Sequence, residues 1–133
     1  MLHSIVIPCY KSSATIRKVV EMTSRELSRL GRDRYEFILV DDCSPDEGAT
    51  LAAITSLAED YPFVKAISLA KNSGQHNAVM AGLNYAQGDF IIAMDDDMQT
   101  HPSQLTYLLA EIEKGYDIVY GYYPEKKHSG FRN

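Results

Sequence analysis

The sequence predicts an α/β domain with a Rossmann-like, doubly wound and mainly parallel sheet, in which five strands alternate with four helices. Short apolar runs of strand length recur along the chain, and most lack polar alternation, as is typical of strands covered on both faces. Between these runs, apolar residues repeat with helical spacing. Strand and helix therefore alternate with short connections, which favours parallel strands joined by crossover helices.

The expected elements follow one another in a regular order. Strands are expected over residues 4–8, 37–40, 64–69, 90–94 and 118–120. The first helix should stop at Gly31, because glycine readily ends a helix. The third should begin with Ser73 as its N-cap and end before Gly88. The fourth should carry Pro102 in its first turn and end at Gly115.

Length and composition indicate one ordinary globular domain. The chain has 133 residues, of which 45% are hydrophobic and 23% are charged. We expect residues 1–121 to form the domain and residues 122–133 a locally basic tail. The net charge of −5 argues against a nucleic-acid-binding protein, which would need a basic surface.

Two further features bear on location. No apolar run approaches the ~18 residues of a membrane span. The two cysteines, Cys9 and Cys43, fit neither a disulfide framework nor a zinc pattern, so we expect a reduced, cytoplasmic compartment and cysteines that pack in the interior. An incidental disulfide between them and the oligomeric state both stay open.

Polar and unusual residues collect where the expected strands end. Pro8 and Tyr10 follow the first strand, Asp41 and Asp42 the second, and Lys71 the third; the fourth is followed by residues 95–99, DDDMQ. In doubly wound sheets, ligands bind outside the carboxyl ends of the strands, near the point where strand order reverses. These residues are therefore the candidate site.

The run Asp95, Asp96, Asp97 carries the strongest chemical signal. Neighbouring carboxylates repel one another unless something neutralises them, and a divalent cation such as Mg²⁺ or Mn²⁺ does so through oxygen ligands. In an extended segment Asp95 and Asp97 share a face while Asp96 points away, and Gln99 continues that face with a neutral oxygen. A solvated acidic loop or a helix cap is the alternative explanation.

The other candidates also have ordinary structural explanations. The carboxylates of Asp41 and Asp42 could accept a hydrogen bond from a nucleobase N–H or a ribose hydroxyl. Polar residues between a strand and a helix also serve as N-caps, and Asp46 or Ser44 could fill that role here. Lys71 could bind a diphosphate together with the N-terminus of the following helix. The alternative is an ordinary surface lysine. His76 and His101 are weak candidates. The chain contains neither GxGxxG nor a Walker lysine loop, which argues against dinucleotide and P-loop sites.

Four segments together resemble the successive motifs of family 2 glycosyltransferases with the GT-A fold. They are residues 5–10 (IVIPCY), 40–46 (VDDCSPD), 71–74 (KNSG) and 94–102 (MDDDMQTHP). The last is similar to the Asp-x-Asp motif of the polyprenyl-phosphate (dolichol-phosphate type) sugar transferases. The match covers nearly the whole chain and is more specific for the family than for the substrate.

The resemblance implies a role for each matching residue. Pro8, Tyr10, Asp41 and Asp42 would line the base and ribose pocket, and Lys71 and Asp96 would add to substrate binding. Asp95 and Asp97 would act in catalysis and, with Gln99, hold the metal. Arg132, in the basic tail, would contact a phosphate.

The sequence also departs from the family's pattern. Residues 11–13 (KSS) replace an acidic residue often found after the first-strand tyrosine, Tyr122 and Tyr123 replace a common arginine, and Lys71 with Asn72 replaces Arg-Asn. The chain ends at Asn133, before the family's acceptor half and C-terminal membrane segments, so we expect a fragment of a longer, peripherally membrane-associated protein.

The expected activity is inverting transfer of a sugar from a nucleotide-diphosphate sugar to an acceptor, either a lipid phosphate or a saccharide. No residue in the chain is a convincing general base, which fits a phosphate acceptor or a base outside these residues. Two alternatives stay open. One is a nucleotide-binding fragment without catalysis, and the other is a receiver-type signalling domain, whose acidic residues would have to follow the first and third strands instead.

Overall fold

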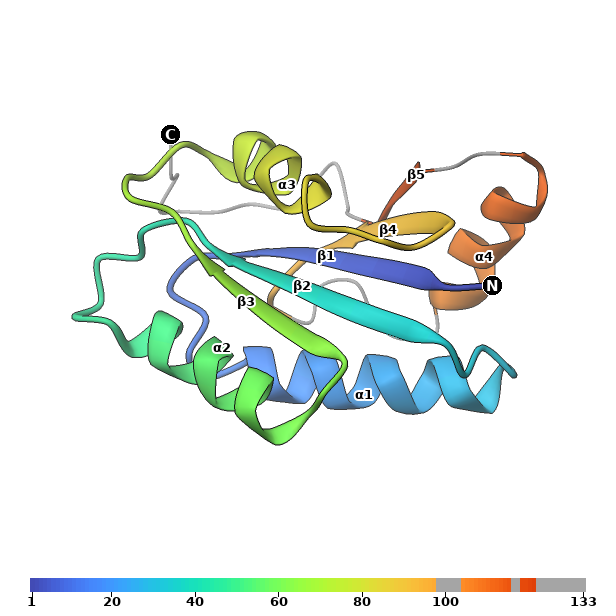
Figure 1. Cartoon of the computed structure of the whole chain (residues 1–133), viewed down its shortest axis with the longest axis horizontal. Helices are drawn as coiled ribbons and strands as arrows, with labels where there is room; N and C mark the ends of the chain where they lie inside the picture. Colours follow the sequence, from blue (N-terminus) through green and yellow to red (C-terminus); the bar gives the residue numbers. More distant parts are fainter. Residues whose placement is uncertain (98–103, 116–117, 122–133) are drawn as a thin grey trace.

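The computed structural model describes residues 1–97, 104–115 and 118–121. All sheet neighbours pair in parallel, in the order β3-β2-β1-β4-β5, which confirms the predicted fold class (Figure 1). The strands are β1 (His3–Cys9), β2 (Tyr35–Asp41), β3 (Val64–Ser68), β4 (Phe90–Met94) and β5 (Ile118–Gly121), and the helices are α1 (Ile16–Arg29), α2 (Ala49–Asp60), α3 (Gln75–Leu83) and α4 (Leu105–Glu113).

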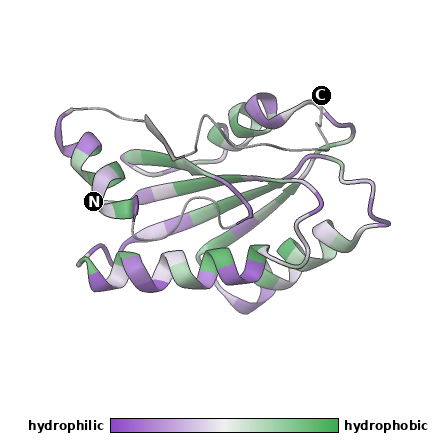
Figure 2. Cartoon of the chain, turned by 180° about the vertical axis from the view of Figure 1, so that it is seen from behind, coloured by the Kyte–Doolittle hydropathy of each residue, from purple (hydrophilic) through white to green (hydrophobic). Residues whose placement is uncertain are grey.

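Helices cover both faces of the sheet. Helices α1 and α2 lie on one face and α3 on the other (Figure 1). Apolar residues of α4 join those of α1 and α2 in one core cluster with alternate residues of the strands, and α3 forms a second cluster with the intervening strand residues. Figure 2 shows the strands coloured mostly as hydrophobic, as expected for strands buried on both faces. Within the described residues no helix combines the length and the apolar character that crossing a membrane requires.

The strand order contains one reversal. The chain runs from β1 outward through β2 to β3 and then returns to place β4 on the other side of β1. Helix α3 makes this return and packs closely on the sheet at Gly82, where an added Cβ would lie 2.7 Å from Val6 Cγ1 and 3.1 Å from Val40 Cγ2. The reversal lies between β1 and β4, so a ligand is expected at their carboxyl ends.

One predicted helix end needs correction. Gly31 follows α1 with a positive φ of 79°, as predicted. The prediction of Ser73 as N-cap of α3 is wrong, because Gly74 occupies that position and the Ser73 hydroxyl donates to Asp42 instead. Helix α3 ends at Leu83, so Gly88 lies after its end, as predicted. Pro102 lies outside the described residues, and α4 begins at Leu105.

A buried carboxylate holds together the amino ends of the strands. Glu36 Oε2 accepts hydrogen bonds from Ser4 Oγ and from the Gln87 backbone N–H, both at 2.6 Å, and Oε1 lies 3.1 Å from Lys65 Nζ. Ser4 Oγ in turn accepts from the Gly88 N–H at 2.8 Å. Burial by itself raises the pKa of Glu36, but these hydrogen bonds outweigh it and leave the pKa below its ordinary value of 4.5.

We expect Glu36→Gln to lower the free energy of unfolding by about 2 kcal/mol at neutral pH, since it weakens hydrogen bonds to a charged, buried group. The pKa of Glu36 is lower in the folded state than its ordinary value. The stability that the ionised carboxylate contributes is therefore complete above about pH 4.5 and is lost as the pH falls through the folded-state pKa. Urea unfolding at several pH values should therefore show the difference from wild type shrinking in acid. The exposed Glu59→Gln is the control, and a constant difference at all pH values would contradict the prediction.

Candidate functional site

The candidate site lies at the carboxyl ends of β1 and β4, on either side of the reversal in strand order. Here the backbone N–H of Tyr10 donates to Asp96 Oδ2 at 2.8 Å, and Thr15 Oγ1 donates to the Asp96 carbonyl at 2.7 Å. Asp96 is buried with 6% of its surface exposed. Two segments 86 residues apart in sequence are thus joined where the fold predicts a ligand.

The neighbouring carboxylates meet different partners. Asp95 is 2% exposed, and its Oδ1 accepts from Gln75 Nε2, the side-chain amide of the first residue of α3, at 3.2 Å. Asp97 is half-buried. Asp95 therefore contacts the first residue of α3, while Asp96 contacts the loop that leads to α1; the shared face of Asp95 and Asp97 stays a prediction.

Asp41 organises the loop that follows β2. It is 5% exposed, and its Oδ1 accepts from the backbone N–H and the hydroxyl of Ser44, at 3.2 and 2.7 Å. Ser44 Oγ accepts in turn from the Lys11 N–H at 3.0 Å. The N-cap of α2 is Gly48, so neither Asp46 nor Ser44 is the cap, but Asp46 supports the helix start, because its Oδ2 accepts from the Thr50 N–H at 3.2 Å. Of the two capping candidates, only Asp46 bonds to α2.

Asp42 joins the end of β2 to the start of α3. Its carboxylate is fully buried; Oδ1 accepts from the Ser73 N–H at 2.8 Å and Oδ2 from the Gly74 N–H at 3.0 Å. A carboxylate at a helix N-terminus is stabilised by the free N–H groups and the helix dipole. The structure thus places Asp42 as a support of the loop before α3, and its predicted contact with a nucleotide stays a prediction.

Two residues of the site loops adopt a backbone conformation that is uncommon outside glycine. Lys11 has φ 53° and Cys43 has φ 54°. Such conformations collect at functional sites, where the surrounding structure must hold them in place. Cys43 is exposed, so the prediction that both cysteines pack in the interior is correct only for Cys9, which is buried.

The carboxylates suit a hard divalent cation, although the described residues contain no group of three His, Cys, Asp or Glu side chains placed to hold a metal. Mg²⁺ and Mn²⁺ prefer oxygen ligands, and Mg²⁺ commonly takes one or two carboxylates and completes its shell with water and phosphate oxygens. The donor set at Asp95 and Asp97 is compatible with that mode of binding.

The structure gathers most of the predicted residues at one edge. Pro8 is buried in β1 beside Val40, Tyr10 is half-buried, and Lys71 is exposed on the loop before α3. Gln99 and Arg132 lie outside the described residues, and so does His101. Sequence reasoning missed the roles of Gln75, Thr15 and Ser44, because hydrogen bonds spanning 20 to 81 residues leave no local pattern.

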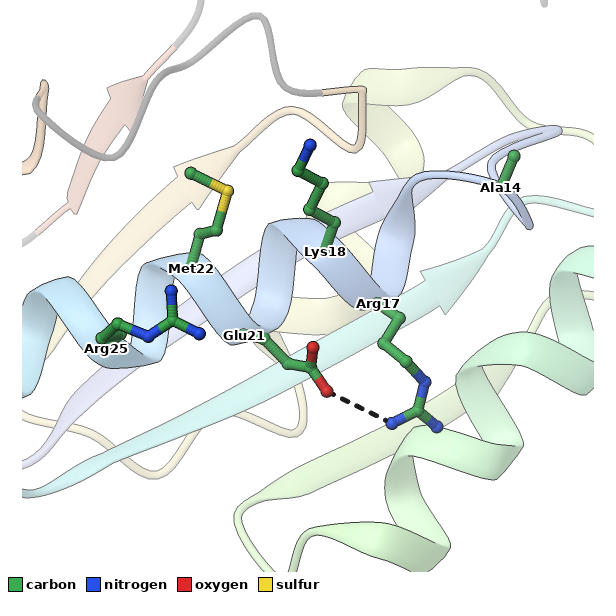
Figure 3. A pocket seen from close by; sticks show the side chains of 6 residues that line it. All are labelled: Ala14, Arg17, Lys18, Glu21, Met22 and Arg25. Atoms are coloured by element: carbon green, nitrogen blue, oxygen red, sulfur yellow. Dashed lines mark hydrogen bonds and ion pairs between the residues drawn. The ribbon is translucent and has the colours of Figure 1, made fainter.

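A separate, open hollow of about 460 Å³ lies on the outer side of α1. Figure 3 shows Arg17 turned toward Glu21, with which it forms an ion pair, and Arg17 also binds Asp60. The ion pair with Asp60 ties α1 to α2. None of the residues lining the hollow is among the predicted site residues; they are Ala14, Arg17, Lys18, Glu21, Met22 and Arg25.

Known proteins with similar sequences are transferases. Two curated relatives are each named undecaprenyl-phosphate 4-deoxy-4-formamido-L-arabinose transferase. The one from Enterobacter sp. (strain 638) is 38% identical over 87% of this chain and 35% of its own length. The one from Proteus mirabilis (strain HI4320) is 39% identical over 97% of this chain and 39% of its own length. The chain thus spans little more than a third of these relatives.

Solved structures share the fold. The mannosyltransferase PcManGT from Pyrobaculum calidifontis, in complex with GDP-Man and Mn²⁺, aligns with a TM-score of 0.63 and 23% identity over 80% of this chain and 32% of its own. S. aureus TarS (residues 1–349) aligns with the same TM-score, 0.63, and 24% identity over 86% of this chain and 33% of its own. These likenesses, at less than 25% identity, show that the fold is shared. Residues 4–133 match the family described as glycosyl transferase family 2, and the chain belongs to that family.

Proposed function

We propose that this chain is the nucleotide-sugar-binding part of an enzyme that, with Mg²⁺ or Mn²⁺, transfers a sugar with inversion to a polyprenyl phosphate. The observation that carries the proposal is the hydrogen bond between Asp96 and the Tyr10 N–H. This bond places the acidic segment at the reversal in strand order, where doubly wound sheets bind ligands. Family membership supports the transfer of a sugar.

Each group of residues has a distinct task in this proposal. Pro8, Tyr10 and Asp41 line the pocket for base and ribose, at the ends of the two adjacent strands β1 and β2. Asp42 supports the neighbouring loop and contributes to the same pocket. Because the Asp41 and Asp42 carboxylates are held by part-buried hydrogen bonds before ligand arrives, these two side chains need little ordering on binding.

The acidic segment faces the diphosphate. Asp95 and Asp97 bind the metal with Gln99, and Asp96 holds the segment against the loop that carries Tyr10. A bound divalent cation would offset the charge that develops on the leaving diphosphate. Lys71 and Arg132 add positive charge toward phosphate groups. The chain's own residues thus bind and orient the donor.

A lipid phosphate is the proposed acceptor for two reasons. The curated relatives carry undecaprenyl phosphate in their names. A phosphate monoester is already largely anionic near neutral pH, with a second pKa of about 6, and needs no general base to attack the sugar. The PcManGT complex with GDP-Man and Mn²⁺ supports a nucleotide-sugar donor and a divalent metal.

Thermal unfolding of the chain with UDP, GDP or CDP, with and without Mn²⁺, tests the proposal. One diphosphate at 100 times its dissociation constant should add about 2.7 kcal/mol to the free energy of unfolding, and EDTA should remove the gain. Asp97→Ala should abolish it as well, because the metal loses a carboxylate ligand.

Asp60→Ala is the matched control, since this exposed aspartate pairs with Arg17 on the outer side of the helices. It should keep the full gain from nucleotide. If no diphosphate stabilises the wild-type chain with metal present, or if Asp97→Ala keeps the whole gain, the proposal is wrong.

A further inference from the structure

We infer that Gln75 is a positioning residue for the donor site, which acts by holding the Asp95 carboxylate in the orientation that binds metal and diphosphate. The inference rests on the proposed function and deepens it. It starts from one contact between the start of α3 and the segment that follows β4. In this contact Gln75 Nε2 donates to Asp95 Oδ1 at 3.2 Å.

Gln75 reaches Asp95 from a well-fixed position. It is the first residue of α3, directly after Gly74, whose N–H binds Asp42 Oδ2 at 3.0 Å. Close packing of α3 on the sheet at Gly82 holds the other end of the helix. The amide is thus carried by a helix that is anchored at both ends, which suits the positioning of a ligand residue.

The chemistry of the amide matches the task. Asp95 is 2% exposed and has two carboxylates directly after it in sequence, so its negative charge needs a donor. A lysine at this position would neutralise Asp95 and compete with a divalent cation. An amide donates a hydrogen bond without adding charge, so Asp95 keeps its attraction for the cation while its rotation is restricted.

The same helix start offers a matched comparison. Asn77 is also an amide of the first turn of α3, and its Nδ2 donates to the Ser73 carbonyl at 2.8 Å. That bond supports the helix start and does not reach the acidic segment. Loss of the Asn77 amide therefore reports on the stability of the helix start, whereas loss of the Gln75 amide also reports on Asp95.

The test measures binding of Mn²⁺ together with the diphosphate, among UDP, GDP and CDP, that stabilises the wild-type chain most. Gln75→Met keeps the length of the side chain and removes the donor. In the Gln75→Met variant, the dissociation constant for the diphosphate should rise about tenfold or more. The Mn²⁺ concentration that gives half-maximal binding should rise by a similar factor. Losses of this size are typical when a hydrogen-bond partner of a metal ligand is removed. Asn77→Leu should leave both within about twofold of wild type.

The outcomes separate the two proposals. If Gln75→Met binds like wild type, or if Asn77→Leu weakens binding equally, Gln75 has no positioning role and the proposed function is untouched. If the wild-type chain binds none of the diphosphates with Mn²⁺, the proposed function fails and the role of Gln75 falls with it. Unfolding temperatures without ligand should drop by similar amounts in the two variants.

Discussion

Asp42→Ala should destabilise the chain by about 3 kcal/mol and abolish metal-dependent nucleotide binding. The Asp42 carboxylate is fully buried and accepts from the N–H groups of Ser73 and Gly74, so its removal leaves both donors without their partner. The start of α3 is then released, and Gln75 and Lys71 move with the loop. Urea unfolding measures the first effect, and calorimetry with Mn²⁺ and the binding diphosphate measures the second.

Asp46→Ala is the control for this result. Asp46 also holds the start of a helix, through the Thr50 N–H and hydroxyl, but it serves α2. Loss of these hydrogen bonds to Thr50 costs about 1 kcal/mol and should leave nucleotide binding intact. The role assigned to Asp42 would be contradicted if the two variants lost equal stability and both kept full binding.

Gly88→Ala should lower the free energy of unfolding by about 3 kcal/mol, through crowding of the backbone. A Cβ at this position would lie 2.8 Å from both the Leu2 carbonyl oxygen and the Ser4 nitrogen, and would also meet Ser4 Oγ. Two of these atoms, the Leu2 oxygen and the Ser4 nitrogen, are backbone atoms. The overlap can therefore be removed only if the backbone shifts. The shift would also disturb the bond from Ser4 to Glu36. Chemical denaturation followed by far-UV circular dichroism measures the loss.

Gly31→Ala distinguishes crowding from backbone conformation. Gly31 has a positive φ of 79°, and nothing lies within 4 Å of an added Cβ, so alanine there should cost only about 1 kcal/mol. A smaller loss for Gly88→Ala than for Gly31→Ala would refute the close approach of the α3–β4 loop to β1.

The sequence was sufficient for the fold because the signals for strands and helices are local. The expected strand at 90–94 matches β4, and the other strands differ only at their ends. At the start of β2, which begins two residues earlier than expected, a polar residue was the reason. Glu36 interrupts an apolar pattern, yet it belongs to β2 because Ser4, Gln87 and Lys65 satisfy its carboxylate.

The candidate site was predicted in its location but not in its connections. The clustering of Asp41, Asp42 and residues 95–97 follows from the rule that parallel strands end at one edge. Ser73 precedes an apolar helical stripe, and that position predicts an N-cap. Its actual partner, Asp42, lies 31 residues earlier, and nothing in the local pattern indicates such a contact.

The central place of β1 has a consequence for synthesis on the ribosome. This strand is translated before the other strands of the sheet, and β2 follows it closely, but its other edge pairs with β4, whose first paired residue is Phe90. At roughly 5–20 residues per second, that edge stays open for several seconds while the intervening chain is translated. An unpaired apolar edge can join other chains, so the growing polypeptide is exposed to association through β1 during that interval.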